Sequence, residues 1–180
     1  ENWALNELHV RTVGSPFVAD GLIIGTTGNG GGGSNYMVAV RPGKSAHVAF
    51  KITTQAPYVP TPVAHDGLLF LWSDRGIVTC VDTSDGKVIW KKRVGGNFFG
   101  SPVRVGDRLY CISEAGDVVV LSASKQFKQL GKNELGEGSR STPATAATVA
   151  SEAKLKAAIA ALGPKPDEYP EQDEHELHVE

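Results

Sequence analysis

Residues 61–90 read TPVAHDGLLFLWSDRGIVTCVDTSDGKVIW, and the fold class can be predicted from this stretch. It begins with a Thr-Pro dipeptide and ends at a tryptophan, and its short apolar runs are separated by turns that contain aspartate and glycine. Such runs are typical of β-hairpins, because glycine accepts the positive φ that tight hairpin turns need. The stretch therefore predicts four short antiparallel strands, at 61–64, 68–72, 77–82 and 87–91.

The same unit recurs along the chain, each time beginning with a Ser/Thr-Pro dipeptide. The prolines of these dipeptides are Pro16, Pro62, Pro102 and Pro143, at intervals of 46, 40 and 41 residues. Trp90 and Leu130 each lie 28 residues after the proline of their unit. Phe50 lies 34 residues after its own proline, which matches the longer first interval. A period of about 40 residues with several short strands in each unit is typical of a β-propeller.

The predicted fold class is all-β, a β-propeller fragment of about three four-stranded antiparallel blades. The blades are expected at 12–54, 58–94 and 98–133. Residues 1–8 are predicted to form the outer strand of a preceding blade, and residues 140–145 the first strand of a following blade. Propellers close at about four to eight blades. The remaining blades are therefore expected in a longer, full-length protein, and self-assembly of such arcs into a ring is the alternative.

The repeat stops after Pro143. Residues 146–163 are predicted to form a short helix, with Leu155, Ile159 and Leu162 on one face and Gly163 at its end. Residues 164–180 hold seven acidic residues and one basic residue, and we expect a disordered acidic tail there.

Composition excludes some classes of function. The part of the chain before residue 164 carries 17 basic and 13 acidic side chains, an excess too small to indicate a nucleic-acid partner. No apolar run approaches the roughly 18 residues that a membrane-spanning helix needs.

Three sequence features could carry chemistry, and each has a simpler structural interpretation. The glycine-rich loop at 28–34 precedes a predicted strand and lacks the Gly-Lys-Ser/Thr of a phosphate-binding loop, so it is interpreted as a hairpin insertion. His175 and His178 lie in the acidic tail, where binding a metal would require ordering the chain. Cys80 and Cys111 lie in apolar runs and show no metal-binding spacing, so they are interpreted as small buried residues. The sequence thus predicts no catalytic, cofactor or metal site.

The segment 76–90, GIVTCVDTSDGKVIW, resembles the pyrroloquinoline-quinone (PQQ) repeat, whose typical ending is D-x-x-T/S-G-K-x-x-W. Asp82, Gly86, Lys87 and Trp90 match this ending. The resemblance covers about residues 2–143, and it departs from the pattern at Phe50, at Leu130 and after Pro143.

This resemblance implies one of two classes of function. The first is a cofactor-free, BamB-like propeller scaffold, which would bind protein or peptide partners in the periplasm or cell envelope, or as a secreted protein. The second is a PQQ-dependent quinoprotein dehydrogenase, which would hold PQQ and Ca²⁺. Those enzymes generally use adjacent cysteines, whereas Cys80 and Cys111 are 31 residues apart, so the scaffold is preferred and any cofactor site is expected in missing blades. A sensor or interaction module of a larger membrane protein is a third possibility.

Binding surfaces can be placed from the expected topology. In a propeller, the turn between the second and third strands opens on the same face as the link to the next blade. Aromatic residues and arginines, which are enriched at protein interfaces, occur in these segments. The candidate partner-binding residues are Arg11, Tyr58, Asp74, Arg75, Asn97, Phe98, Glu114 and Arg140. The alternative is that Tyr58, Phe98 and Phe99 pack between blades, and this alternative is favoured for Phe99.

Overall fold

The computed structural model describes residues 4–30 and 34–143. All described residues belong to one unit of the chain, Glu1–Thr145. The predicted helix at 146–163 and the predicted acidic tail at 164–180 lie outside the described residues.

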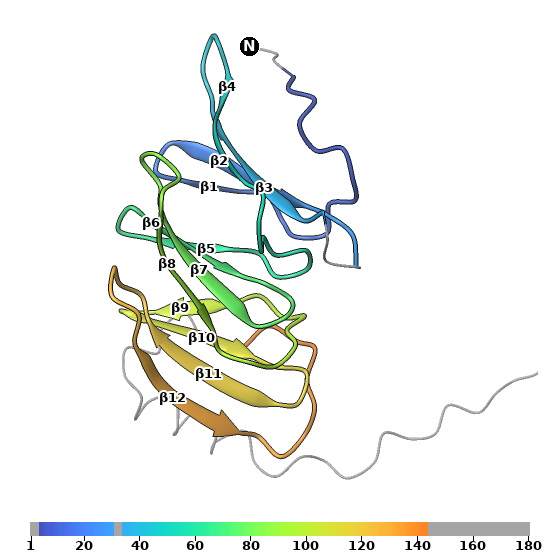
Figure 1. Cartoon of the computed structure of the whole chain (residues 1–180), viewed down its shortest axis with the longest axis vertical. Coiled ribbons are helices and arrows are strands. Elements are labelled where there is room, and N and C mark those ends of the chain that lie inside the picture. Colours follow the sequence, from blue (N-terminus) through green and yellow to red (C-terminus); the bar gives the residue numbers. More distant parts are fainter. Residues whose placement is uncertain (1–3, 31–33, 144–180) are drawn as a thin grey trace, which may run out of the picture. The chain divides into compact units, whose positions relative to one another are not determined.

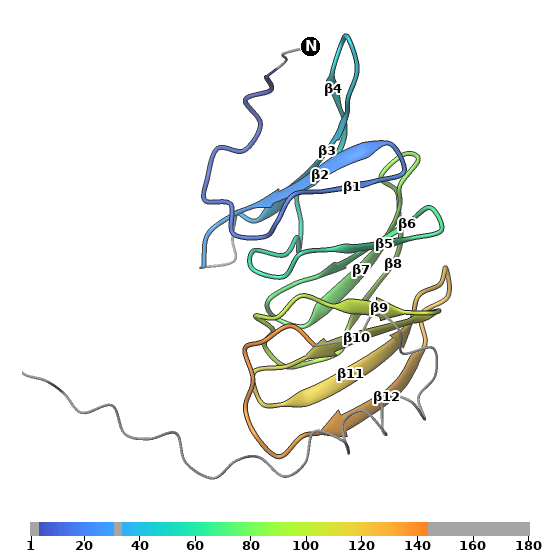
Figure 2. The same cartoon turned by 180° about the vertical axis from the view of Figure 1, so that it is seen from behind.

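The described residues form three four-stranded sheets, each built from consecutive antiparallel strands (Figures 1 and 2). The first sheet consists of β1 (Phe17–Ala19), β2 (Leu22–Thr27), β3 (Tyr36–Arg41) and β4 (His47–Ile52). The second consists of β5 (Val63–His65), β6 (Leu68–Trp72), β7 (Ile77–Asp82) and β8 (Val88–Arg93). The third consists of β9 (Val103–Val105), β10 (Arg108–Ile112), β11 (Asp117–Ser122) and β12 (Gln129–Glu134).

The predicted fold class is confirmed for the described residues, which contain four-stranded antiparallel sheets and no helix. The four strands predicted within 61–90 lie within two residues of their expected bounds. The repeat extends to local irregularities as well. Each sheet has a register shift where its third strand pairs with its fourth, at Ala39/Val40, at Cys80/Val81 and at Val120/Leu121.

The two flanking strands that we predicted are not formed by the described residues. Residues 4–8 and 140–143 contain no strand. A strand needs a backbone partner, which the third strand of a preceding blade or the second strand of a following blade would supply. The described ranges 4–30 and 34–143 contain neither of these strands.

The core lies between consecutive sheets and is made by alternate residues of the same strands. Leu69 and Leu71 of β6 belong to a buried cluster shared with the first sheet. Leu68, Phe70 and Trp72 of the same strand belong to a second cluster, shared with the third sheet. All five residues of β6 are buried. The continuous apolar run at 68–72 is therefore explained by a strand that is covered on both faces.

The Ser/Thr of each Ser/Thr-Pro dipeptide joins its sheet to the next. The backbone N–H of Ser15 donates to Thr61 Oγ1 at 3.0 Å. The N–H of Thr61 donates to Ser101 Oγ at 2.9 Å. The N–H of Ser101 donates to Thr142 Oγ1 at 3.0 Å. The recurrent dipeptide thus supplies an acceptor side chain to the preceding unit, and this hydrogen-bond relay extends to Thr142 although no strand is formed there.

The aromatic residue near the end of each of the first two units packs against the next sheet. A Cβ on Gly86 would lie 2.4 Å from the ring of Phe50, so the first sheet places its aromatic residue directly on a turn of the second. Trp90 repeats this arrangement. Its indole N–H donates to the carbonyl of Ser124 at 3.1 Å, and its ring centroid lies 5.2 Å from that of Phe127. Leu130, at the corresponding place in the third sheet, is 41% exposed.

Candidate functional site

A pocket of about 220 Å³ opens where the segments that link the sheets meet the turns between second and third strands. We call it the link pocket. The first sheet and the link that follows it contribute Asn29, Gly30, Asn35, Gln55, Ala56, Tyr58 and Val59. The β6–β7 turn and the link to the third sheet contribute Ser73, Asp74, Arg75, Asn97 and Phe99. Tyr58, Asp74, Arg75 and Asn97 were predicted from the sequence, so half of the eight candidate residues lie in this one pocket.

The turn that presents Asp74 and Arg75 is stabilised by local hydrogen bonds. Gly76 N donates to the carbonyl of Ser73 at 3.0 Å, and Ile77 N donates to Ser73 Oγ at 3.0 Å. Gly76 has φ of 67°, and a Cβ there would lie 2.3 Å from the carbonyl oxygen of Gly95. Only glycine suits both the positive φ and the close approach of the following link. The third sheet repeats this turn at Ser113 and Gly116.

Asp74 joins the turn to the link that precedes the second sheet. Its Oδ2 accepts the backbone N–H of Tyr58 at 2.7 Å, and its Oδ1 accepts that of Val59 at 3.0 Å. The carbonyl of Asp74 accepts the N–H of Phe98 at 2.8 Å, from the link that follows the sheet. Asp74 therefore holds both walls of the pocket, and its carboxylate is already hydrogen-bonded within the protein.

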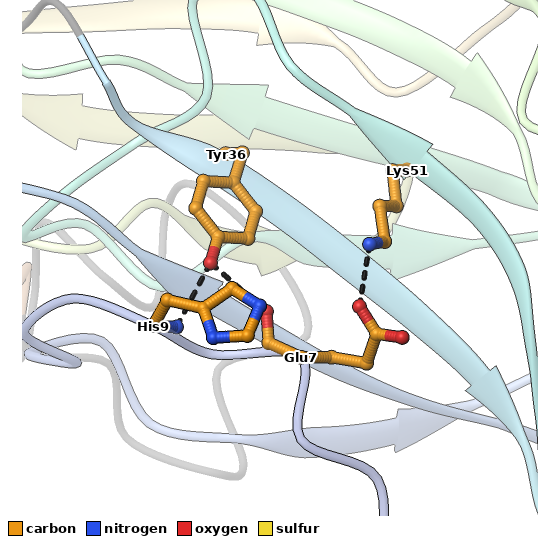
Figure 3. A network of polar contacts seen from close by, with 4 residues as sticks. All are labelled: Glu7, His9, Tyr36 and Lys51. Carbon is orange, nitrogen blue, oxygen red and sulfur yellow. Dashed lines mark hydrogen bonds and ion pairs between the residues drawn. The ribbon is translucent and has the colours of Figure 1, made fainter.

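Residues 7–11 reach the same region along the first sheet. Tyr36 donates its hydroxyl proton to the carbonyl of Glu7 at 2.9 Å and accepts the backbone N–H of His9 at 2.9 Å (Figure 3). The Glu7 carboxylate also forms an ion pair with Lys51. Further along, Arg11 donates to the hydroxyl of Tyr58 at 3.3 Å. Arg11 thus lies beside the pocket and contacts one of its lining residues.

Glu114 and Arg140 form a second group near Phe99. Arg140 donates to Glu114 Oε1 through Nη2 at 2.6 Å and through Nε at 3.1 Å. The Arg140 guanidinium lies 4.9 Å from the centroid of the Phe99 ring. Neither Glu114 nor Arg140 lines the link pocket, but both help to fix the position of the aromatic ring that does.

Of the two neighbouring phenylalanines, Phe98 packs in the core and Phe99 lines the pocket. Phe98 is fully buried, and its ring packs edge-on against Trp72 at 5.3 Å between centroids. Phe98 thus follows the alternative of packing between blades, and its side chain is not available to a partner. Phe99 is 36% exposed and lines the pocket, whereas the sequence favoured it as the packed residue.

Gln55 is a pocket residue that sequence reasoning missed. Its φ of 59° lies in the left-handed region, which side chains other than glycine adopt rarely. The other non-glycine residues with positive φ, Asp20 and Asp66, each precede a glycine in a hairpin turn. Gln55 lies in the segment Thr-Thr-Gln-Ala-Pro, which carries no such turn signal. The left-handed backbone of Gln55 depends on the path of the link between β4 and β5, so it could not be predicted from the sequence.

The two cysteines are buried and free. Burial, together with the charge of Asp82, raises the pKa of Cys80 to about 12, and burial also raises the pKa of Cys111. At neutral pH both are thiols, which are poor nucleophiles and poor metal ligands. This agrees with the interpretation of both residues as small buried side chains.

The described residues contain neither a cluster of metal-binding side chains nor a helix that could span a membrane. The ranges 4–30 and 34–143 bring together no group of three His, Cys, Asp or Glu side chains that could hold a metal ion. Within the same ranges, no helix has the length and apolar character needed to cross a bilayer.

Comparison with solved structures finds the same fold in proteins of two kinds. BamB from Moraxella catarrhalis matches with a TM-score of 0.60 and 20% identity, over 76% of this chain and 40% of that one. A europium-containing methanol dehydrogenase matches with a TM-score of 0.55 and 16% identity, over 68% of this chain and 25% of that one. A quinohemoprotein alcohol dehydrogenase from Pseudomonas putida HK5 matches with a TM-score of 0.51 and 16% identity, over 73% of this chain and 20% of that one. This chain thus spans less than half of each of these proteins, and the likeness concerns the fold alone.

Comparison with curated protein sequences gives no match. A family model described as "Outer membrane protein assembly factor BamB" matches residues 48–161, which is more than half of the chain. The matched region includes the second and third sheets together with the turns and links that form most of the link pocket. The chain therefore belongs to the family described as outer membrane protein assembly factor BamB, and its three sheets are a partial propeller of PQQ-type repeats.

Proposed function

We propose that this chain is part of a non-enzymatic β-propeller scaffold that binds protein or peptide partners outside the cytoplasm. The observation that carries the proposal is the link pocket. Four residues chosen from the sequence as partner-binding candidates line it, and Arg11 contacts it. Aromatic residues and arginine at the edge of a recess are enriched in protein interfaces.

The turns and links around the pocket suit a binding role because the sheets hold them in place. Asp74 ties the β6–β7 turn to the backbone on both sides of it. A partner therefore meets side chains whose positions are largely set before it binds, which lowers the entropy lost on association. The family description, an outer membrane protein assembly factor, supports both a protein partner and a place in the cell envelope.

A PQQ-dependent dehydrogenase is the second candidate, because two of the solved structures with the same fold are dehydrogenases. The scaffold proposal requires neither PQQ nor Ca²⁺. Cys80 and Cys111 lie in different sheets, so they do not supply the adjacent pair of cysteines that this class of enzyme generally uses. Ca²⁺ is typically bound by 6–8 oxygen ligands, and the Asp74 carboxylate in the pocket is occupied by two backbone N–H groups.

Site-specific photo-crosslinking in the protein's own cells tests the scaffold proposal. A photo-reactive phenylalanine analogue replaces Arg75 in the pocket or, as the matched control, exposed Lys87 on the β7–β8 turn at the other end of the same sheet. We expect a discrete crosslinked partner from position 75 and none from position 87. Equal crosslinking from both positions contradicts the placement of the binding surface.

A second experiment separates the scaffold from the enzyme. The full-length protein is incubated with PQQ and Ca²⁺, and oxidation of alcohols and sugars is followed with an artificial electron acceptor. We expect no turnover above that of PQQ and Ca²⁺ alone. Protein-dependent turnover would overturn the scaffold proposal in favour of the dehydrogenase.

A further inference from the structure

We infer that the link pocket binds the main chain of an extended peptide and places a large apolar side chain of that peptide against Phe99. The inference rests on the proposed function, because it names the part of a protein partner that the same site takes. Three features of the pocket carry it: its side-chain amides, the backbone conformation of Gln55, and the exposed ring of Phe99.

Side-chain amides dominate the polar lining of the pocket. Asn29, Asn35, Gln55 and Asn97 all line it, and Asn35 Oδ1 already accepts the backbone N–H of Asn29 at 2.9 Å. The side-chain amides of Gln55 and Asn97 form no hydrogen bond with the described part of the chain. Each amide can donate two hydrogen bonds and accept through its oxygen, which complements the alternating N–H and C=O groups of a peptide backbone.

The charges of the lining favour a neutral group over an ion. Asp74 and Arg75 are the charged lining residues, one of each sign. Both oxygens of the Asp74 carboxylate already accept backbone N–H groups of the protein. A neutral peptide backbone requires only the amides.

The conformation of Gln55 is the second feature. Its left-handed backbone, with φ of 59°, is strained for a residue with a side chain. Strained residues of this kind tend to gather at binding sites, where the conformation directs a side chain. Glycine would adopt this φ without strain, so glutamine at this position keeps an amide in the pocket at a cost in stability. This gives a direct test, because a structural role and a binding role predict different effects of Gln55→Gly.

Phe99 provides an apolar contact for the peptide side chain. The ring is 36% exposed and lines the pocket, and the guanidinium of Arg140 lies over it. Val59 also lines the pocket. It corresponds to Phe99 in the repeat, because each lies three residues before the proline of its unit. Aromatic residues, phenylalanine among them, are enriched at protein interfaces relative to the rest of the surface.

Fluorescence anisotropy on the full 180-residue chain tests the inference. The probe is a labelled, end-blocked decapeptide of sequence Gly-Ser-Thr-Leu-Thr-Leu-Thr-Leu-Ser-Gly. One matched probe has its alternate backbone nitrogens methylated, and another has serine in place of leucine. We expect the first probe to bind with a dissociation constant below 1 mM. We expect each matched probe to bind at least about tenfold more weakly, because N-methylation removes backbone donors and serine removes the apolar contact.

Variants then assign the binding to the pocket. We expect Gln55→Gly, Asn97→Ala and Phe99→Ala each to weaken binding at least about fivefold. Gln129→Ala, which removes an exposed amide on β12, should leave it unchanged. Gln55→Gly should also raise the urea midpoint, because it relieves the positive φ. A purely structural role for Gln55 predicts no loss of binding.

Several results would overturn the inference. They are failure of the leucine peptide to bind at 1 mM, equal binding of the N-methylated probe, displacement of the peptide by maltoheptaose, and parental affinity of Gln55→Gly. If any of these occurs while position 75 still crosslinks a partner, the proposed function stands and only the inferred recognition of a peptide backbone fails. Absence of that crosslink counts against the proposed function itself.

Discussion

Trp90 is the residue whose removal should most weaken the contact between the second and third sheets. Its ring lies 6.0 Å from that of Phe70 and 5.2 Å from that of Phe127, between centroids. Its indole N–H also donates to the Ser124 carbonyl. Trp90→Ala therefore removes a half-buried aromatic side chain, two ring contacts and one hydrogen bond that crosses between sheets.

The expected loss follows from these contacts. Replacing a fully buried Phe or Trp by Ala typically costs about 3–5 kcal/mol. An aromatic pair contributes about 0.5–1.5 kcal/mol beyond the area it buries, and a neutral hydrogen bond contributes about 1 kcal/mol. Because Trp90 is only partly buried, we expect Trp90→Ala to lower the free energy of unfolding by about 2–4 kcal/mol. Trp90→Phe, which keeps a ring but removes the N–H, should lose about 1–2 kcal/mol.

Urea unfolding followed by far-UV circular dichroism measures both variants, and the repeat supplies a matched control. Leu130 occupies the corresponding position in the third sheet and is 41% exposed, so Leu130→Ala should change stability by less than about 1 kcal/mol. If Trp90→Ala unfolds at the same urea concentration as the parent, Trp90 does not join the sheets. If Leu130→Ala loses as much stability as Trp90→Ala, the loss does not depend on packing against a following sheet.

Three further predictions concern single positions. Asp74→Ala should lower the free energy of unfolding by about 1–3 kcal/mol in urea melts, because two backbone N–H groups lose a charged acceptor; parental stability would show that these bonds contribute nothing. Gly86→Ala should lower the thermal midpoint, because its φ is 77° and a Cβ would lie 2.4 Å from an aromatic ring of the neighbouring sheet. Gly131→Ala, where a Cβ meets nothing within 4 Å, is the control, and equal midpoints would contradict the predicted clash. Cys80 and Cys111 should resist a thiol reagent at pH 8 until urea unfolds the chain. Burial raises the pKa of the Cys80 thiol from 9.0 to about 12. The stability that the buried, protonated thiol contributes is therefore complete below pH 9 and falls as the pH rises from 9 to 12. Labelling of the folded chain, or stability that does not fall across this range, would contradict the burial of Cys80.

Much of the fold could be predicted because its signals are local and repeated. The Asp-Gly pairs at 20–21 and 66–67 adopt the positive φ angles that hairpin turns need, so the residue types alone place those turns. The regular interval between Ser/Thr-Pro dipeptides, which can be read directly from the sequence, predicts the number of units. The structure adds the reason for the dipeptide, which is the hydrogen bond from each Ser/Thr N–H to the hydroxyl of the next unit.

The candidate site was predicted less completely. Topology was enough to select Tyr58, Asp74, Arg75 and Asn97, because turns and links at one end of the strands must lie near one another. It was not enough to decide between adjacent residues. Phe98 and Phe99 are the same residue type, and the structure places Phe98 against Trp72 in the core and leaves Phe99 partly exposed.

The repeat, the strands and the end of each sheet at which the candidate binding residues lie could all be predicted from the sequence alone. These depend on backbone preferences and on the alternation of side chains, which act over a few residues. Three features could be seen only in the folded chain: Phe99 rather than Phe98 lines the pocket, Gln55 takes a left-handed conformation, and the Asp74 carboxylate accepts hydrogen bonds from the link before it. Each of these depends on how a link crosses from one sheet to the next, and that path is set by contacts between residues far apart in the sequence.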